Sequence, residues 1–196
     1  MTETLSQHLL DAALILFGEF HTRESSDSRQ PFALQLEMLA SYPAALQNAA
    51  QATAKLLQEG PRPERLLCVP EALPLATLVS QYADLPLVYL DRQGREASLV
   101  GAYDIGHPTL LITNHQAPGA LHGLIQSARR VGLEVAGIVT LVGWGSSGNC
   151  EGVPVWRVLT LEEVIAAAED QDILPRQHAD LVRAWIAQAD VTPRQD

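Results

Sequence analysis

The chain has 196 residues, a hydrophobic content of 47% and a formal net charge of −10. This length suits a single domain with a sizeable core, and no apolar run approaches the ~20 residues that a membrane-spanning helix needs. The acidic balance argues against nucleic acid as a partner, because such binding depends on Lys and Arg contacts to phosphates. Two cysteines, Cys68 and Cys150, form neither a disulfide framework nor a metal-ligand spacing. We therefore expect one domain over residues 1–196, in the cytoplasm, with no membrane contact.

The first half of the sequence predicts alternating helices and strands. Apolar residues recur at helical spacing or in short buried-type runs, and Gly and Pro separate these segments. Ser41 is expected to cap a helix that has Pro43 in its first turn. The elements expected in this half are a helix at 4–17, a polar loop at 18–30, an extended segment at 32–36, a helix from 43 to about 57, a strand at 65–69, a helix at 74–81, a strand at 86–90 and a loop or hairpin at 91–106.

The second half centres on a strand, a tight loop, a helix and a second strand. Apolar runs place the strands at 109–113 and 135–142, and Leu121, Leu124, Ile125 and Ala128 recur at helical spacing between them. Such a unit puts a loop at the carboxyl end of a strand and above a helix N-terminus, the usual place for an anionic ligand. The elements expected after it are a loop at 143–152, a strand at 153–158, a helix at 161–168 with a capping box of Thr160 and Glu163, and a helix at 174–189.

This alternation predicts an α/β fold with a parallel sheet flanked by helices. Several short segments, in a shared order, resemble type I phosphoribosyltransferases, and most of all orotate phosphoribosyltransferases. They are Gly18-Glu19-Phe20, Leu73-Pro74-Leu75-Ala76, Leu85-Pro86-Leu87-Val88-Tyr89 and Gly152-Val153-Pro154-Val155, and the similarity covers most of residues 14–168. The resemblance implies a single phosphoribosyltransferase-like domain with a small hood, formed by about residues 1–40 and the C-terminal part.

The loop after residue 112 resembles the phosphoribosyl-pyrophosphate loop of that family. There it reads roughly hydrophobic-hydrophobic-Asp-Asp-x-x-Thr-Thr-Gly-x-Ser, whereas here it runs from Leu111 to Leu121 without an acidic residue. The acidic pair that holds the ribose hydroxyls in the family falls on Thr113 and Asn114, which carry no charge. The match assigns these candidate phosphate- or ligand-binding residues: Thr113, Asn114, His115, Gln116, Ala117, Gly119, Ala120, Leu121 and Arg92.

The family also places cationic side chains on the substrate phosphates, and this sequence has fewer of them at the matching positions. Glu71 stands where the resemblance implies a phosphate-binding lysine, and Asp91-Arg92 matches an Arg-Lys pair, so that only Arg92 keeps its charge. The whole chain contains twelve arginines but one lysine, Lys55. Electrostatic stabilisation is usually the largest catalytic contribution, so these changes predict a weakened or lost transfer reaction.

Three functions remain open from the sequence. The first is an orotate-phosphoribosyltransferase-like protein without phosphoribosyl transfer, acting as a binding, regulatory or assembly subunit. The second is an active orotate or other phosphoribosyltransferase of pyrimidine or nucleotide metabolism with divergent motifs, the one function that would require Mg²⁺. The third is a different small-molecule enzyme that uses Asn114 or His115.

For the first function we expect no catalytic residue, no cofactor and no metal. His115 and His122 lie seven residues apart but have no Cys or carboxylate partner nearby in the sequence. The expected ligand is a weakly bound anion or nucleotide-like small molecule, and the expected assembly is a homodimer through the segments 31–42 and 70–82.

Overall fold

The computed structural model describes residues 4–22, 25–60, 62–91, 98–102, 105–115, 125–126, 128–144 and 148–191. Its first helix, α1 (Leu5–Asp11), starts at a capping box in which the side chains of Thr4 and Gln7 bond each other's backbone N–H. The predicted helix over 4–17 is too long. It ends at Asp11 because Ala13 adopts a left-handed φ of 51° and the N–H of Leu14 turns back to the carbonyl of Leu9.

The predicted polar loop at 18–30 is wrong, because most of that segment is β-structure. Strand β1 (Ile15–Thr22) pairs antiparallel with β2 (Ser25–Leu34) in a two-stranded ribbon. An exposed pair across the ribbon, Arg29 Nη1 to Glu19 Oε2, spans 3.0 Å. A polar segment reads as a loop when its pairing partner is unknown.

The helical segments that follow the ribbon come in the expected order. A short 3₁₀ helix, η1 (Leu36–Ser41), precedes α2 (Pro43–Glu59), and η2 (Pro70–Ala72) precedes α3 (Leu73–Ala83). Pro43 opens α2 as predicted, but Ser41 lies inside η1 and the N-cap is Tyr42, which makes no side-chain capping bond. The predicted cap is therefore wrong.

The main sheet has seven strands in the order β5-β4-β3-β6-β7-β9-β8. Its five central strands run parallel, and β5 and β8 pair antiparallel at the two edges. The strands are β3 (Arg65–Cys68), β4 (Leu87–Asp91), β5 (Ser98–Val100), β6 (Pro108–His115), β7 (Glu134–Gly143), β8 (Asn149–Cys150) and β9 (Val153–Thr160). The predicted α/β fold with a parallel sheet is confirmed.

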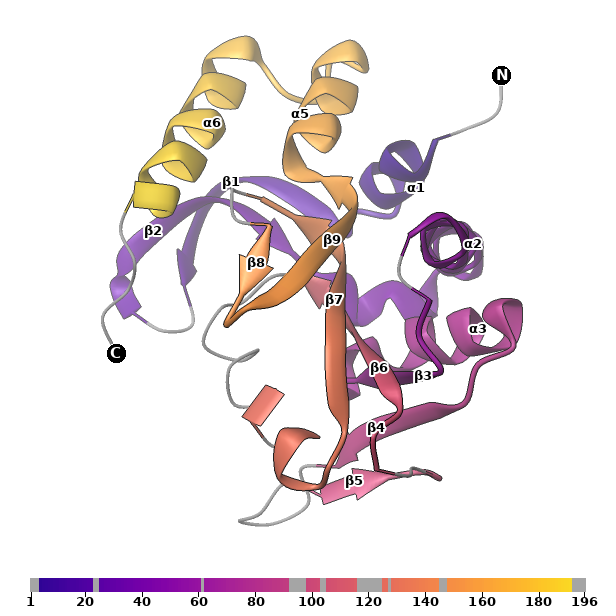
Figure 1. Cartoon of the computed structure of the whole chain (residues 1–196). Coiled ribbons are helices and arrows are strands. Elements are labelled where there is room, and N and C mark those ends of the chain that lie inside the picture. The colour runs from indigo at the N-terminus through magenta and orange to yellow at the C-terminus, as the bar shows by residue number, and fades with distance from the viewer. Residues whose placement is uncertain are drawn as a thin grey trace.

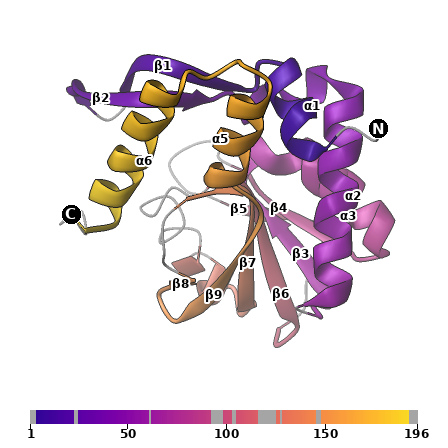
Figure 2. The ribbon, with the colours of Figure 1, turned by 90° about the horizontal axis from the view of Figure 1, so that it is seen from above.

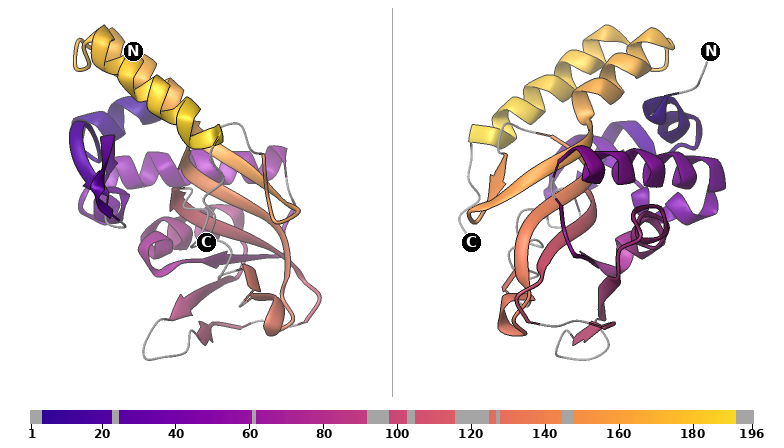
Figure 3. Two further views of the ribbon diagram at one scale, coloured as in Figure 1. Left: turned by 90° about the vertical axis from the view of Figure 1, so that its left-hand side faces the viewer. Right: turned by 45° about the vertical axis from the view of Figure 1, so that its right-hand side comes forward.

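The hydrophobic core is formed by buried side chains of the sheet and of the helices that pack against it. Residues Leu110, Leu111 and Ile112 of β6 are all fully buried, as expected for a parallel strand covered on both faces. Helices α2 and α3 lie next to each other along the sheet, as Figures 1 and 3 show. Among the described residues, no helix is long and apolar enough to cross a membrane.

The last two helices and the ribbon gather at the end of the sheet where β9 leads into α5 (Leu161–Asp170) (Figures 1 and 2). The predicted capping box of α5 is present, with Thr160 N donating to Glu163 Oε2 at 2.7 Å. Helix α6 (Arg176–Val191) packs against β2 and is tied to α5 by Arg183. The ribbon and α6 thus meet near the carboxyl end of β7, where Phe32 contacts Trp144 and Trp185.

Candidate functional site

The carboxyl end of β6 carries the first three residues of the predicted ligand loop. Thr113 is buried, and its Oγ1 donates a 2.8 Å hydrogen bond to the carbonyl of His115. Asn114 is 4% exposed, and its Nδ2 donates to the main-chain carbonyls of Glu71 at 2.8 Å and Leu36 at 3.3 Å. Both side chains are therefore engaged by the protein's own backbone.

The amide of Asn114 connects three segments that are distant in sequence. It extends from β6 and reaches η1 through Leu36 and η2 through Glu71. Only a side chain with two N–H donors can satisfy two carbonyl oxygens at one nitrogen, and a carboxylate offers acceptors alone at neutral pH. The local geometry therefore favours asparagine over aspartate at this position.

Aromatic rings link the strand ends to the ribbon and to α6. The rings of His115 and Trp144 stack at 6.3 Å with an interplanar angle of 22°. Phe32 of β2 is fully buried and meets Trp144 edge-on at 5.6 Å and Trp185 of α6 edge-on at 5.3 Å. We call these four residues the aromatic chain. It fixes the ribbon over the ends of β6 and β7, because edge-to-face pairs favour one relative placement of their elements.

The neighbouring strand β3 ends at the thiol of Cys68, and Glu71 lies just beyond it in η2. Burial, and secondarily the negative charge of Glu71, raises the pKa of the Cys68 thiol to about 12. Burial also raises the pKa of the Cys150 thiol. Both thiols stay protonated at neutral pH, and a protonated thiol is neither a nucleophile nor a metal ligand.

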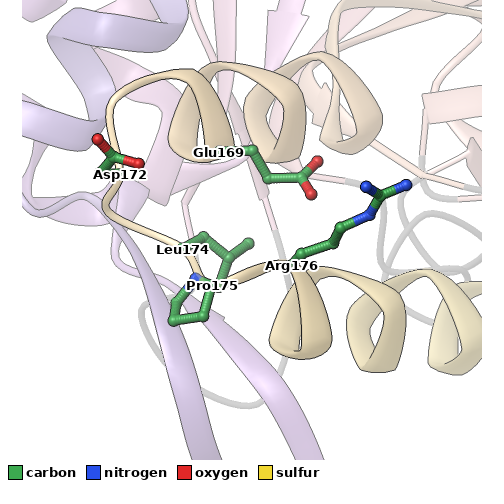
Figure 4. Close-up of a pocket in the computed structure, with 5 residues that line it drawn as sticks. All are labelled: Glu169, Asp172, Leu174, Pro175 and Arg176. Carbon is green, nitrogen blue, oxygen red and sulfur yellow. The ribbon is translucent and has the colours of Figure 1, made fainter.

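A cavity of about 470 Å³ lies elsewhere, at the turn between α5 and α6 (Figure 4). Its lining residues are Glu169, Asp172, Leu174, Pro175 and Arg176. The carboxylate of Glu169 is held by Arg183, whose hydrogen bond lowers the pKa of that carboxyl. The cavity contains none of the predicted site residues.

Much of the predicted ligand site falls outside the residues that the structure describes. Those positions are Gln116, Ala117, Gly119, Ala120, Leu121, Arg92 and also His122. Their ligand-binding role stays a prediction. Within the described ranges, no three His, Cys, Asp or Glu side chains are grouped so that they could hold a metal ion.

Sequence reasoning missed two features of this site. It assigned Trp144 to the start of a Gly/Ser-rich turn and Phe32 to a short extended segment, so it gave no sign that the two rings meet. It also passed over Arg157 of β9, which pairs with Thr140 of β7 and whose side chain lies against Gly143. A contact between elements more than a hundred residues apart, such as that of Phe32 and Trp144, leaves no periodic signal in a single sequence.

No protein-family model matches the chain, but solved structures do. UMP synthase of Leishmania donovani is similar with a TM-score of 0.81 and 26% identity over 94% of this chain, which spans only 42% of the length of that protein. Orotate phosphoribosyltransferase of Francisella tularensis gives a TM-score of 0.72 at 18% identity, with 92% of this chain and 96% of that chain covered. The enzyme of Aeropyrum pernix gives 0.70 at 22% identity, with 85% and 98% covered.

The chain thus has the type I phosphoribosyltransferase fold, and its structural neighbours include orotate phosphoribosyltransferases and a UMP synthase. Fold alone does not establish an activity, because one fold hosts many functions. The function has to be argued from the residues at the strand ends.

Proposed function

We propose that this protein has lost phosphoribosyl transfer and acts as a ligand-binding, regulatory or assembly subunit built on the phosphoribosyltransferase fold. The observation that carries the proposal is the use of Asn114. Its amide lies where the family resemblance implies an acidic residue, and both of its donor bonds go to the chain's own carbonyls. With its amide hydrogens committed to the backbone, Asn114 keeps one uncharged acceptor, Oδ1, which has no hydrogen-bond partner among the described residues, in place of the two anionic oxygens of a carboxylate.

The side chains of Thr113 and Asn114, which the structure describes at the end of β6, do not fit Mg²⁺. That ion prefers carboxylate and phosphate oxygens in octahedral geometry. The hydroxyl of Thr113 donates to a carbonyl, and the nitrogen of Asn114 donates to two carbonyls while its Oδ1 is uncharged. Neither of these two side chains supplies an anionic oxygen, so we derive no metal-assisted step.

A coupled assay with orotate, phosphoribosyl pyrophosphate and Mg²⁺ tests the proposal directly. We expect no transfer by this protein under conditions in which the orotate phosphoribosyltransferase of Francisella tularensis turns over. Turnover of about one per second, an ordinary enzymatic rate, would contradict the proposal. A thermal-shift screen with the same compounds and with nucleotides identifies a ligand, because binding raises the melting temperature by mass action.

A second candidate is an active phosphoribosyltransferase with divergent motifs. It is favoured by the 26% identity to UMP synthase over 94% of this chain. It predicts orotate-dependent release of pyrophosphate, which the same assay measures. The two candidates therefore give opposite results in one experiment.

We also propose a cytoplasmic homodimer. Met38 and Tyr42, in the segment predicted as an interface, are 45% and 36% exposed, which leaves apolar surface for a second copy to cover. Sedimentation at micromolar concentration should give a dimer, and the paired change Met38→Asp and Tyr42→Asp should shift it to monomer. The control is Leu181→Asp, at an exposed leucine of α6. A monomeric parent protein would refute the dimer.

A further inference from the structure

A charged side chain without a partner lies at the start of the main sheet. Arg65, the first residue of β3, is only 7% exposed, and all four residues of that strand are buried. Its Nε and Nη1 are enclosed and have no hydrogen-bond partner among the residues that the structure describes. An arginine stays charged in a protein, so it cannot avoid the cost of burial by losing its proton. An uncompensated buried charge is strongly destabilising, and it therefore indicates a missing partner.

The polar side chains beside Arg65 are engaged elsewhere. The carboxylate of Glu64, the preceding residue, is paired with Nδ1 of His107. Thr109 lies opposite Arg65 in the register of β3 and β6, and its Oγ1 donates to the carbonyl of His107 at 3.0 Å. The chain has 23 Asp and Glu residues, but in the part that the structure describes none of them forms an ion pair with Arg65. Among these residues the fold thus encloses a cation and places no anion against it.

This cation lies at the opposite end of the sheet from the predicted ligand loop. Arg65 and Thr109 stand at the amino ends of the parallel strands β3 and β6. Thr113 follows Thr109 by four strand residues, which span about 13 Å. Asn114 and the loop come later still along the chain. Arg65 therefore marks a separate place in the fold, away from the strand ends on which the family resemblance rests.

We propose that Arg65 is the recognition residue of an anion-binding site at the amino ends of β3 and β6, and that this site takes a small oxyanion, either a carboxylate or a phosphate group. The inference goes beyond the proposed function. It neither requires nor excludes phosphoribosyl transfer, because it concerns the other end of the sheet.

The chemistry of the guanidinium supports this ligand class. An oxyanion supplies acceptor oxygens and also neutralises the charge, whereas a water molecule supplies an acceptor alone. Of the three guanidinium nitrogens, only Nη2 is not among the enclosed, unpaired atoms, so the group opens toward solvent at that nitrogen. Nε and Nη2 form one edge of the planar group, and a carboxylate or phosphate accepts two parallel hydrogen bonds from such an edge. Burial strengthens the attraction compared with the same pair in water, and the enclosure of Arg65 favours a small ion.

Titration of the full chain with sodium acetate and, separately, with inorganic phosphate tests the proposal at constant ionic strength and tells the two anion classes apart. The signal of the Arg65 Nε–H group in NMR spectra, assigned by its loss in Arg65→Lys, should shift with at least one of the two anions. Arg65→Met should weaken the binding measured by calorimetry at least tenfold. Arg62→Met is the matched control, since it removes an exposed arginine three residues earlier and should leave the affinity unchanged.

Melting temperatures separate an anion-binding arginine from a merely structural one. In sodium chloride, Arg65→Met should melt above the parent protein, because an apolar side chain replaces an unpaired buried charge. The bound anion should raise the melting temperature of the parent and of Arg62→Met, but not that of Arg65→Met. Arg65→Lys keeps the charge, should fold like the parent and should also bind more weakly, because it loses the paired donors. The proposal is overturned if neither anion shifts the Arg65 signal, if Arg65→Met or Arg65→Lys binds as well as Arg62→Met, or if Arg65→Met melts below the parent in chloride.

Discussion

The amide Nδ2 of Asn114 donates a 2.8 Å hydrogen bond to the main-chain carbonyl of Glu71, and so joins the end of β6 to η2. The same nitrogen reaches the carbonyl of Leu36 in η1 at 3.3 Å. These two buried hydrogen bonds explain why the position holds asparagine. They also give a measurable consequence for the substitution that would restore an acidic residue.

Asn114→Asp should destabilise the protein by about 2–4 kcal/mol at pH 7, because a buried carboxylate would oppose two carbonyl oxygens. Burial raises the folded-state pKa of such a carboxyl above its unfolded value. The protonated form is therefore favoured in the folded state, and the destabilisation should shrink as the pH falls toward 4. Urea unfolding at pH 7 and pH 4 measures both effects.

Thr113→Ser is the matched control for that change, since it keeps the hydroxyl that donates to His115. It should cost less than about 1 kcal/mol. The double change Thr113→Asp and Asn114→Asp should not create transfer activity, because it adds no cation for the substrate phosphates. An Asn114→Asp variant as stable as the parent at pH 7 would contradict the structural role.

Phe32→Ala should destabilise the protein by about 3–4 kcal/mol, since it leaves a cavity and removes two edge-to-face contacts. Near-ultraviolet circular dichroism should change with it, because Trp144 and Trp185 lose the ring between them. Tyr82→Ala, which removes a ring that is 42% exposed, is the control and should cost less than about 1 kcal/mol. Equal losses in the two variants would refute a special role for the aromatic chain.

Glu169→Gln should lower the melting temperature at pH 7, because it removes the carboxylate that accepts a 2.7 Å bond from Arg183 between α5 and α6. The hydrogen bond to Arg183 lowers the folded-state pKa of Glu169 below its ordinary 4.5. Its stabilisation is therefore fully present above pH 4.5 and is lost as the pH falls through the lowered folded value. The difference in melting temperature between Glu169→Gln and the parent protein should vanish in acid. Glu134→Gln, at an exposed glutamate of β7, is the control and should melt like the parent protein at both pH values.

Cys68 should resist alkylation by iodoacetamide in the native protein at pH 8. Its pKa of about 12 leaves almost no thiolate, and the side chain is fully buried. Cys150 is only partly buried and should react first, though slowly, because burial raises its pKa too. Peptide mass spectrometry locates the label, and the urea-unfolded chain, in which both thiols react, is the control. Native labelling of Cys68 ahead of Cys150 would contradict the buried placement.

Local pattern alone determined most of the central sheet. The apolar runs at 65–69, 86–90, 109–113 and 135–142 became β3, β4, β6 and β7. Strands β3, β6 and β7 are buried along most of their length and are therefore largely apolar there, whereas buried and half-buried residues alternate in β4. The capping box of Thr160 and Glu163 was likewise readable, since all of its bonds lie within four residues. The order of short motifs extended this to the fold family.

Tertiary structure alone decided the rest. The polar segment 18–30 forms a ribbon only because β1 finds β2, and its placement depends on Phe32 meeting Trp144 and Trp185 from distant elements. The same holds for Asn114: its residue type could be read as a lost acid, but not its two bonds to Leu36 and Glu71. Contacts between segments far apart in the chain leave no period and no spacing in one sequence, so only the folded arrangement assigns them.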